Sequence, residues 1–266
     1  MDSLRQLLQP SVEYTARGLH GAITMDASVL TISWQGLVFA AAPTLVVLVV
    51  LWRWSAGAGT AVYANVRMLA QLLLIGYVLV YIFEAGEPSI VLGVLGVMLV
   101  AASFIAIRPL AKTSSAAYWH ALLAISLPGL LVLALVSQVV IGVDPWFEPR
   151  YLVPLAGMVF SGGMNAVSLA GERAQAEAAR GVGYTETRRI ALHAALIPIT
   201  NSLFAVGLVA LPGMMTGQIL SGVSPLIAAK YQIVVMLMLF GVAGLSAAFF
   251  ILLERPGLLA LAAEQE

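Results

Sequence analysis

Few side chains in the apolar parts of this sequence can take part in chemistry, and most of them are amides. Arg67 lies inside an otherwise uncharged stretch, Asn65 just precedes it, and Gln71 follows one helical turn later. Residues i and i+4 share one helix face. If that helix spans a bilayer, a charge at its centre costs roughly 2.5–3.5 kcal/mol. Arg67 then needs an oppositely charged partner, a water-filled path, or a side chain long enough to extend to the membrane interface. Two interpretations stay open: these residues line a polar path or helix contact, or Arg67 extends to the inner headgroups while Gln71 bonds a neighbouring helix.

Two further amides and one irregular block add to this inventory. Asn165 and Asn201 stand next to small or helix-bending residues, and for them we expect hydrogen bonds between helices. The block 212–222 opens with Pro-Gly, so its backbone carbonyls are not all used by a helix, and irregular backbone at membrane depth is tolerated where it lines a cavity. We predict a cavity or gate there, with a structural kink as the alternative. The candidate residues of this block are Met214, Met215, Thr216 and Gln218.

The sequence contains no pattern typical of a metal site or an enzyme. It has no Cys, and its three His residues, His20, His120 and His193, are far apart. Iron prefers imidazole, carboxylate or thiolate ligands, whereas methionine thioethers are soft. No buried pair of His, Asp or Glu and no nucleophile–base pair can be drawn from the apolar segments. We therefore expect no metal site, no cofactor bound by this chain and no catalysis.

The elements that position these residues must be membrane-spanning helices. Hydrophobic residues make up 61% of the 266 and charged residues 10%, with a mean hydropathy of +0.98. A soluble domain carries about 25% charged residues. So few charged residues cannot cover the surface of a protein that is folded in water, so we expect the protein to lie in a lipid bilayer. The 13 basic residues equal the 13 acidic ones, which gives no basic surface for nucleic acid.

Charge-free runs locate the spans, each of which needs about 20 apolar residues. They cover residues 27–52, 88–107, 113–143, 151–171, 190–229 and 231–253, and an apolar segment at 61–83 is interrupted only by Arg67. We predict an all-α integral membrane protein with about seven transmembrane helices. The run 190–229 is predicted as a helix to about Met214 followed by a non-helical or re-entrant piece, with a second short helix as the alternative.

Basic residues predict the orientation, because cytoplasmic loops are enriched in Lys and Arg. With the N-terminus outside and the C-terminus inside, the inner loops hold eight Lys and Arg and the outer segments four. We expect a polar, amphipathic segment at 1–28, a transmembrane domain at 29–257 and a tail at 258–266.

One inner loop, Glu172–Arg189, is unusually polar. Its Ala, Glu, Gln and Arg are good helix formers, so we predict a short cytosolic helix along the membrane face. The motif Glu-Ala-Ala-x-x-x-Gly at 177–183 resembles the loop by which permeases of ATP-binding-cassette (ABC) importers contact their ATPase. An ordinary charged loop is the alternative. The predicted coupling residues are Glu172, Arg173, Glu177, Ala178, Ala179, Arg180, Gly183 and Arg188.

Four longer blocks carry a more specific resemblance. They lie at 65–77, 154–169, 195–202 and 207–222, and the last contains Leu-Pro-Gly-Met-Met-Thr-Gly-Gln-Ile-Leu at 211–220. With these blocks, most of residues 30–257 resembles the FetB family of bacterial iron-export ABC permeases, to which plant aluminium-tolerance permeases are related. The 172–189 loop is shorter and less charged than that family's pattern.

The resemblance implies that the domain at 29–257 is a permease of a bacterial inner membrane. Such a permease is a transport subunit that works with a separate ATPase. The chain has no Gly-x-x-x-x-Gly-Lys-[Ser/Thr] motif, and its only lysines are Lys112 and Lys230. ATP and Mg²⁺ are then expected on two copies of the partner ATPase, bound to a homodimer of this permease that exports iron or a related metal species by alternating access. The alternative is a secondary transporter or channel acting alone, against which stands the lack of buried Asp or Glu relays.

Overall fold

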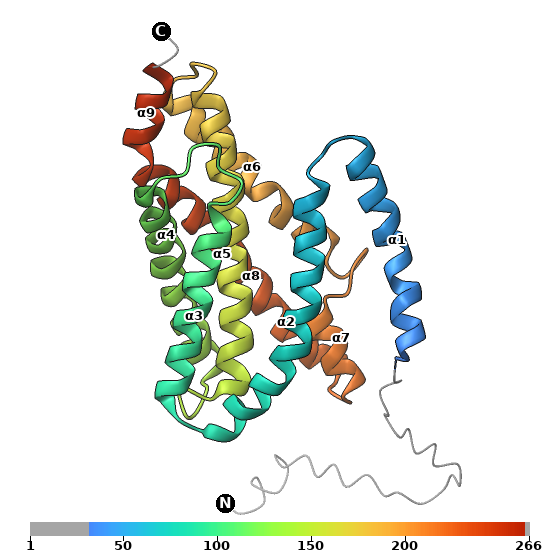
Figure 1. Cartoon of the computed structure of the whole chain (residues 1–266). Coiled ribbons are helices and arrows are strands. Elements are labelled where there is room, and N and C mark those ends of the chain that lie inside the picture. Colours follow the sequence, from blue (N-terminus) through green and yellow to red (C-terminus); the bar gives the residue numbers. More distant parts are fainter. Residues whose placement is uncertain (1–31, 264–266) are drawn as a thin grey trace, which may run out of the picture. The chain divides into compact units, whose positions relative to one another are not determined.

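The computed structural model describes residues 32–263, and every regular element in this range is a helix (Figure 1). This confirms the predicted all-α fold class. The chain divides within α1 (Trp34–Arg53) into two units, Met1–Ala41 and Ala42–Glu266. Of the first unit the described range holds residues 32–41, and the predicted segment 1–28 lies outside the described residues.

The second unit contains the remaining helices, several of which begin where the sequence dictates. Pro88, Pro149 and Pro225 each occupy the first turn of a helix, where the missing N–H costs nothing and the fixed φ suits the helix. The elements are α2 (Ala58–Ala85), α3 (Pro88–Ala106), α4 (Ser115–Ala134), its π-helical continuation η1 (Leu135–Ile141), α5 (Pro149–Ala178), α6 (Tyr184–Ala205), α7 (Gly213–Leu220), α8 (Pro225–Leu253) and α9 (Arg255–Ala263).

Within the described range, six segments are long and apolar enough to cross a membrane: α1, α2, α3, α4 with η1, α5 and α8. Their bounds lie within seven residues of the predicted apolar runs. The seventh predicted span corresponds to α6, whose 22 residues extend for about 33 Å. That length suffices, but Glu186, Arg188 and Arg189 open the helix and α6 is not among the six. The seventh crossing and the orientation that depends on it stay predictions.

Two local predictions were wrong. The loop Glu172–Arg189 does not contain a separate helix, because α5 continues without a break to Ala178 and α6 begins at Tyr184. No residue between 171 and 178 disfavours a helix, and the chain reverses only at Gly181, whose φ is +76°. The run after Ile190 is not helical to Met214 either: α6 ends at Ala205, and the short helix that was the alternative forms as α7.

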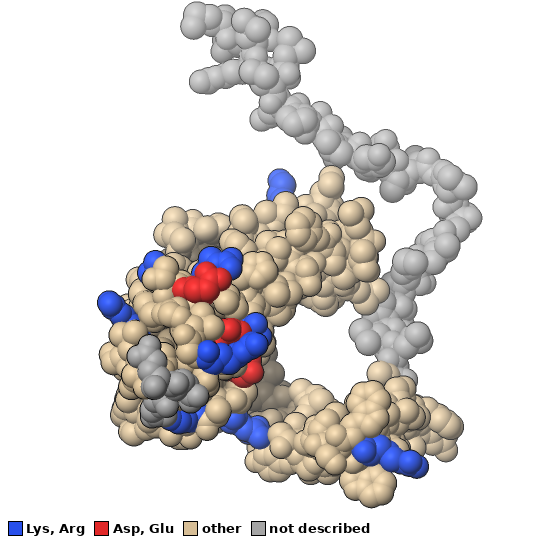
Figure 2. Space-filling model, turned by 90° about the horizontal axis from the view of Figure 1, so that it is seen from above, with Lys and Arg blue, Asp and Glu red and all other residues tan. Residues whose placement is uncertain are grey.

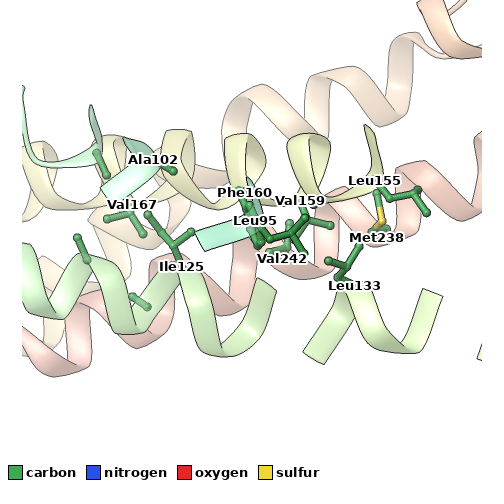
Figure 3. Close-up of a cluster of buried hydrophobic side chains, with 14 of the residues drawn as sticks. Leu95, Ala102, Ile125, Leu133, Leu155, Val159, Phe160, Val167, Met238 and Val242 are labelled. Atoms are coloured by element: carbon green, nitrogen blue, oxygen red, sulfur yellow. The ribbon is translucent and has the colours of Figure 1, made fainter. Parts of the chain in front are cut away.

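Helix α5 occupies the centre of the second unit and packs against α3, α4, α6 and α8. Its buried face supplies Leu155, Val159, Phe160 and Val167 to the main hydrophobic cluster (Figure 3). A second cluster consists mainly of alanines from α5, α6 and α8. Small residues allow these helices to approach closely, so α5 is held firmly along most of its length.

Candidate functional site

Several polar residues of the apolar helices lie along a groove formed by α5, α6, α7 and α8. Its first part is a cavity of about 280 Å³ bordered by Met158 and Asn165 of α5 and by Pro198 and Ser202 of α6. The second part, about 390 Å³, shares Met158 and Ser202 with the first and adds Met214 of α7. The two cavities are therefore neighbours along the same helices.

A third cavity of about 350 Å³ continues the groove between α6 and α8. It shares Gln232 and Met236 with the second cavity and is also lined by Met215. Along α8 the three cavities reach from Ala243 to Ala229, which at 1.5 Å per residue is about 21 Å. The groove thus follows roughly two thirds of the hydrocarbon thickness of about 30 Å.

The structure brings together some of the predicted path residues and separates others. Asn165, Met214 and Met215 line the groove. The Thr216 hydroxyl donates to the backbone oxygen of Pro212 at 3.2 Å, within its own turn. The half-buried Gln218 keeps a buried amide oxygen without a hydrogen-bond partner in the described residues, and Asn201 is exposed on α6.

The three predicted residues of α2 do not line this groove. The Asn65 amide donates to the backbone oxygen of Ala61 at 2.8 Å, so it is satisfied within its own helix. Arg67 is half-buried, Gln71 is exposed, and among the described residues no carboxylate pairs with Arg67. Helix α2 packs mainly against α3 and α5. A role of these residues in a path stays a prediction.

A charged cap, formed by Arg173, Glu177, Arg180, Glu186 and Arg189, lies where α5 turns into α6. Figure 2 looks onto this end of the second unit and shows basic and acidic side chains gathered there. The Glu177 carboxylate is only 4% exposed. It accepts from Arg173 at 2.7 Å and lies 3.7 Å from Arg180, whose side chain is 71% exposed.

The turn that carries this cap is closed by its own backbone. The N–H of Val182 donates to the Glu177 oxygen and that of Gly181 to the Ala178 oxygen, which is the Schellman pattern at a helix end. The Thr187 hydroxyl donates to the Val182 oxygen at 3.0 Å and is fully buried. The turn is thus a defined structure rather than a loose connector.

Side-chain contacts connect the cap to the rest of the unit. The buried Gln175 amide brackets the backbone of Lys112, accepting from its N–H at 3.1 Å and donating to its oxygen at 2.9 Å. Tyr184 donates to the Ile251 oxygen at 3.4 Å, and Arg255 lies over its ring at 5.3 Å. These contacts join the ends of α5 and α6 to the α3–α4 loop and to the end of α8.

On the exposed side of the cap, Arg189 donates two hydrogen bonds to the Glu186 carboxylate, at 2.8 and 2.5 Å. These hydrogen bonds hold the pKa of Glu186 below its ordinary value and raise that of Arg189. Both groups stay charged near neutral pH. A cavity of about 430 Å³ beside them, lined by Arg188 and Arg189, lies between the same helices α6 and α8 that form the groove.

Six of the eight predicted coupling residues are exposed, as a contact surface requires. These are Glu172, Arg173, Ala179, Arg180, Gly183 and Arg188. Glu177 and Ala178 are buried. Glu177 therefore positions Arg173 and Arg180 and does not itself present a surface to a partner.

Sequence reasoning missed several residues of this site. Gln232 and Ser202 line the groove, and Gln175 and Tyr184 hold the cap. A signal existed for Gln232, which is a single amide within the apolar run of α8. Gln175 and Tyr184 carry no such signal, because their partners lie more than 60 residues away in the sequence.

The fold defines a multi-pass helical membrane protein, in which a groove runs along α5, α6, α7 and α8. A model of the family described as "Uncharacterised protein family (UPF0014)" matches residues 34–188 and 182–257. The chain belongs to this family, as the sequence resemblance predicted.

Relatives with descriptive names support this membership. The chain is 34% identical to the UPF0014 membrane protein slr1647 of Synechocystis over 83% of this chain and 88% of that protein. It is 33% identical to the Probable iron export permease protein FetB of Escherichia coli, over 68% and 74% respectively. It is 31% identical to Protein ALUMINUM SENSITIVE 3 of Arabidopsis thaliana, over 78% and 81%. No solved structure matches the chain.

Proposed function

We propose that this chain is the permease subunit of an ABC transporter that exports iron or a related metal species across a bacterial inner membrane. Two permease chains form a homodimer, and two copies of a separate ATPase subunit bind ATP with Mg²⁺ and hydrolyse it. The iron assignment draws on the name of the Escherichia coli relative, a probable iron export permease.

One observation carries the proposal: the two helices that meet at the charged cap are also walls of the groove. Helix α5 runs without a break from Glu177 in the cap to Met158 in the groove, a distance of about 28 Å along its axis. Helix α6 leads from Arg189 to Ser202. A push on the cap is therefore delivered to the groove along α5, and along α6 past the bend that Pro198 permits.

The contacts of the cap favour a rigid-body motion over a local one. The hydrogen bonds of Gln175 to Lys112 and of Tyr184 to Ile251 join α5 and α6 to their neighbours at the same end. Closure of two ATPases against this end then rocks several helices together, which is a population shift between two states of the groove.

The test is affinity purification of the tagged chain from its native membrane in mild detergent, with identification of the proteins that accompany it. A stoichiometric subunit carrying a Walker nucleotide-binding motif is expected. The double variant Arg180→Ala with Arg189→Ala removes two exposed charges of the cap and is expected to reduce the recovery of that subunit several-fold.

Arg150→Ala is the matched control. Arg150 is exposed and also lies on α5, but at the opposite end of the helix, so this variant is expected to retain the ATPase in full. A homo-oligomer without any ATPase would overturn the proposal and favour a transporter that works alone. Equal loss from both variants would show that the cap is not the docking surface.

A further inference from the structure

The cavity of about 430 Å³ between α6 and α8, beside the charged cap, changes from basic to aliphatic along its length. Arg188 and Arg189 line it from the first two turns of α6, and Leu192 follows one turn further along the helix. On α8 the lining consists of Leu252 near the helix end and Ala248 one turn before it. The cavity therefore has guanidinium groups at one end and aliphatic side chains at the other.

This cavity lies where a membrane-spanning helix ends. Helix α8 is long and apolar enough to cross a membrane as far as Leu253, and the charged residues Glu254 and Arg255 follow directly. The Tyr184 hydroxyl donates to the Ile251 oxygen at 3.4 Å, so the start of α6 lies level with this end of α8. The guanidinium end of the cavity is thus at the level of the lipid headgroups, and the aliphatic end is at the level of the acyl chains.

Two arginines meet at the basic end without a carboxylate between them. The Cζ atoms of Arg188 and Arg255 lie 6.0 and 5.3 Å from the centre of the same Tyr184 ring. Neither arginine forms a salt bridge within the described residues. Like charges this close repel each other, and an anion that accepts hydrogen bonds from both stabilises the pair.

The neighbouring carboxylates are already engaged. Arg189 donates to the Glu186 carboxylate at 2.8 Å, and the Glu254 carboxylate lies 2.7 Å from Nδ1 of His120. Arg188 is exposed. Its guanidinium donors are therefore available to an anionic group from outside the chain.

We propose that this cavity binds an anionic phospholipid, with the phosphate on Arg188 and Arg255 and an acyl chain along Leu192 and Ala248. A planar guanidinium donates two parallel hydrogen bonds to phosphate oxygens, and basic pockets between membrane helices bind anionic headgroups. The volume of about 430 Å³ falls within the range of small-molecule sites, about 300–1,000 Å³. A water-soluble partner would leave the aliphatic end of the cavity empty, whereas a lipid fills both ends.

Lipid binding to the purified full-length chain, delipidated in mild detergent, tests this by native mass spectrometry without any ATPase. The probes are dioleoylphosphatidylglycerol, dioleoylphosphatidylcholine, whose choline adds a compensating positive charge, and glycerol phosphate, which has no acyl chain. A single phosphatidylglycerol is expected to stay bound to each chain, with about tenfold weaker binding of phosphatidylcholine and none of glycerol phosphate. Equal binding of the two lipids overturns the inference, as does glycerol phosphate bound as tightly as phosphatidylglycerol.

Arg188→Gln removes one guanidinium from the basic end and is expected to weaken the binding of phosphatidylglycerol about tenfold. Arg108→Gln is the matched control, because Arg108 is exposed in the α3–α4 loop and does not line the cavity. This variant makes the same change of charge and is expected to bind the lipid like the wild type. Equal loss in the two variants would show that only the overall charge matters, and would overturn the inference.

A third variant tests the aliphatic end. Ala248 is half-buried and lines the cavity, so Ala248→Phe fills this end without changing a charge and is expected to weaken the binding of both lipids several-fold. Unchanged binding of both lipids by this variant overturns the inference. If Arg188→Gln instead keeps the lipid and loses the ATPase in the purification above, the arginine belongs to the docking surface of a partner protein, and the inference is likewise overturned.

Discussion

Adding one methyl group to α5 at Gly171 tests whether its close approach to α8 holds the cap against the helix core. A Cβ atom at this position would lie 2.9 Å from Cε1 of Phe250 and 3.1 Å from Cδ1 of Leu110. The ring of Phe250 is 1% exposed, so it cannot swing out into open space. Gly171→Ala therefore forces the helix ends apart or distorts the packing.

The magnitude follows from two opposing effects. Overpacking a core costs about 1–3 kcal/mol, whereas Gly→Ala inside a helix stabilises by about 0.8–1.0 kcal/mol. Gly157→Ala on the same helix is the matched control, because its Cβ would meet only Cε of Met98 at 3.5 Å, an ordinary contact. The helix contribution cancels between the two variants, which leaves a difference of about 1–3 kcal/mol.

Thermal unfolding of the purified variants in the same detergent measures this difference. One kcal/mol shifts Tm by about 2–4 °C in a chain of this size class, so Gly171→Ala is expected to unfold about 2–12 °C below Gly157→Ala. If the two variants have the same Tm, the approach of α5 to Phe250 and Leu110 is not tight, and the argument that the cap is held firmly fails.

Three further predictions concern the cap and the core. Glu177→Gln removes the carboxylate charge that pairs with both Arg173 and Arg180. Hydrogen bonds to a charged group contribute about 1.5–3 kcal/mol, so the free energy of unfolding is expected to fall by that amount. An unchanged Tm would show that the pairing does not stabilise the fold. Ser246→Ala deletes a fully buried hydroxyl that has no partner among the described residues, and is expected to raise stability by about 1 kcal/mol; a lower Tm would reveal a partner. Because the pKa of Glu186 is lowered in the folded chain, its small contribution is present at neutral pH and is lost as the pH falls below the ordinary glutamate pKa of about 4.3; the wild type should therefore lose slightly more Tm between pH 7 and pH 3.5 than Glu186→Gln, and an equal loss would contradict this.

The helices themselves could be predicted from the sequence because each leaves a local signal. Charge-free runs of about 20 residues and prolines at helix starts, as at Pro88, Pro149 and Pro225, locate most elements to within a few residues. Where the signal was ambiguous the prediction failed. The polar residues after Gly171 suggested a loop with its own helix. These residues are good helix formers, and they extend α5 to Ala178 instead.

The candidate site could be predicted only in part. Asn165, Met214 and Met215 were named from the sequence and do line the groove. Gln232 lines it too but was not named, whereas Gln71 was named and does not line it. Both are single glutamines in apolar helices. Only their neighbours separate them: Gln232 faces α6 and α7 across the groove, while Gln71 is exposed on α2.

The sequence by itself thus determined that this is a helical membrane protein, where six of its apolar helices lie and to which family it belongs, because hydropathy and specific blocks of residues are local properties. The tertiary structure decided which polar side chains share a space. Helix α8 is apolar on nearly every side, so no periodic pattern marks the face that turns toward the groove. That choice depends on packing between helices distant in the sequence, and it places Gln232 and Met214, rather than Arg67, in the same cavity wall.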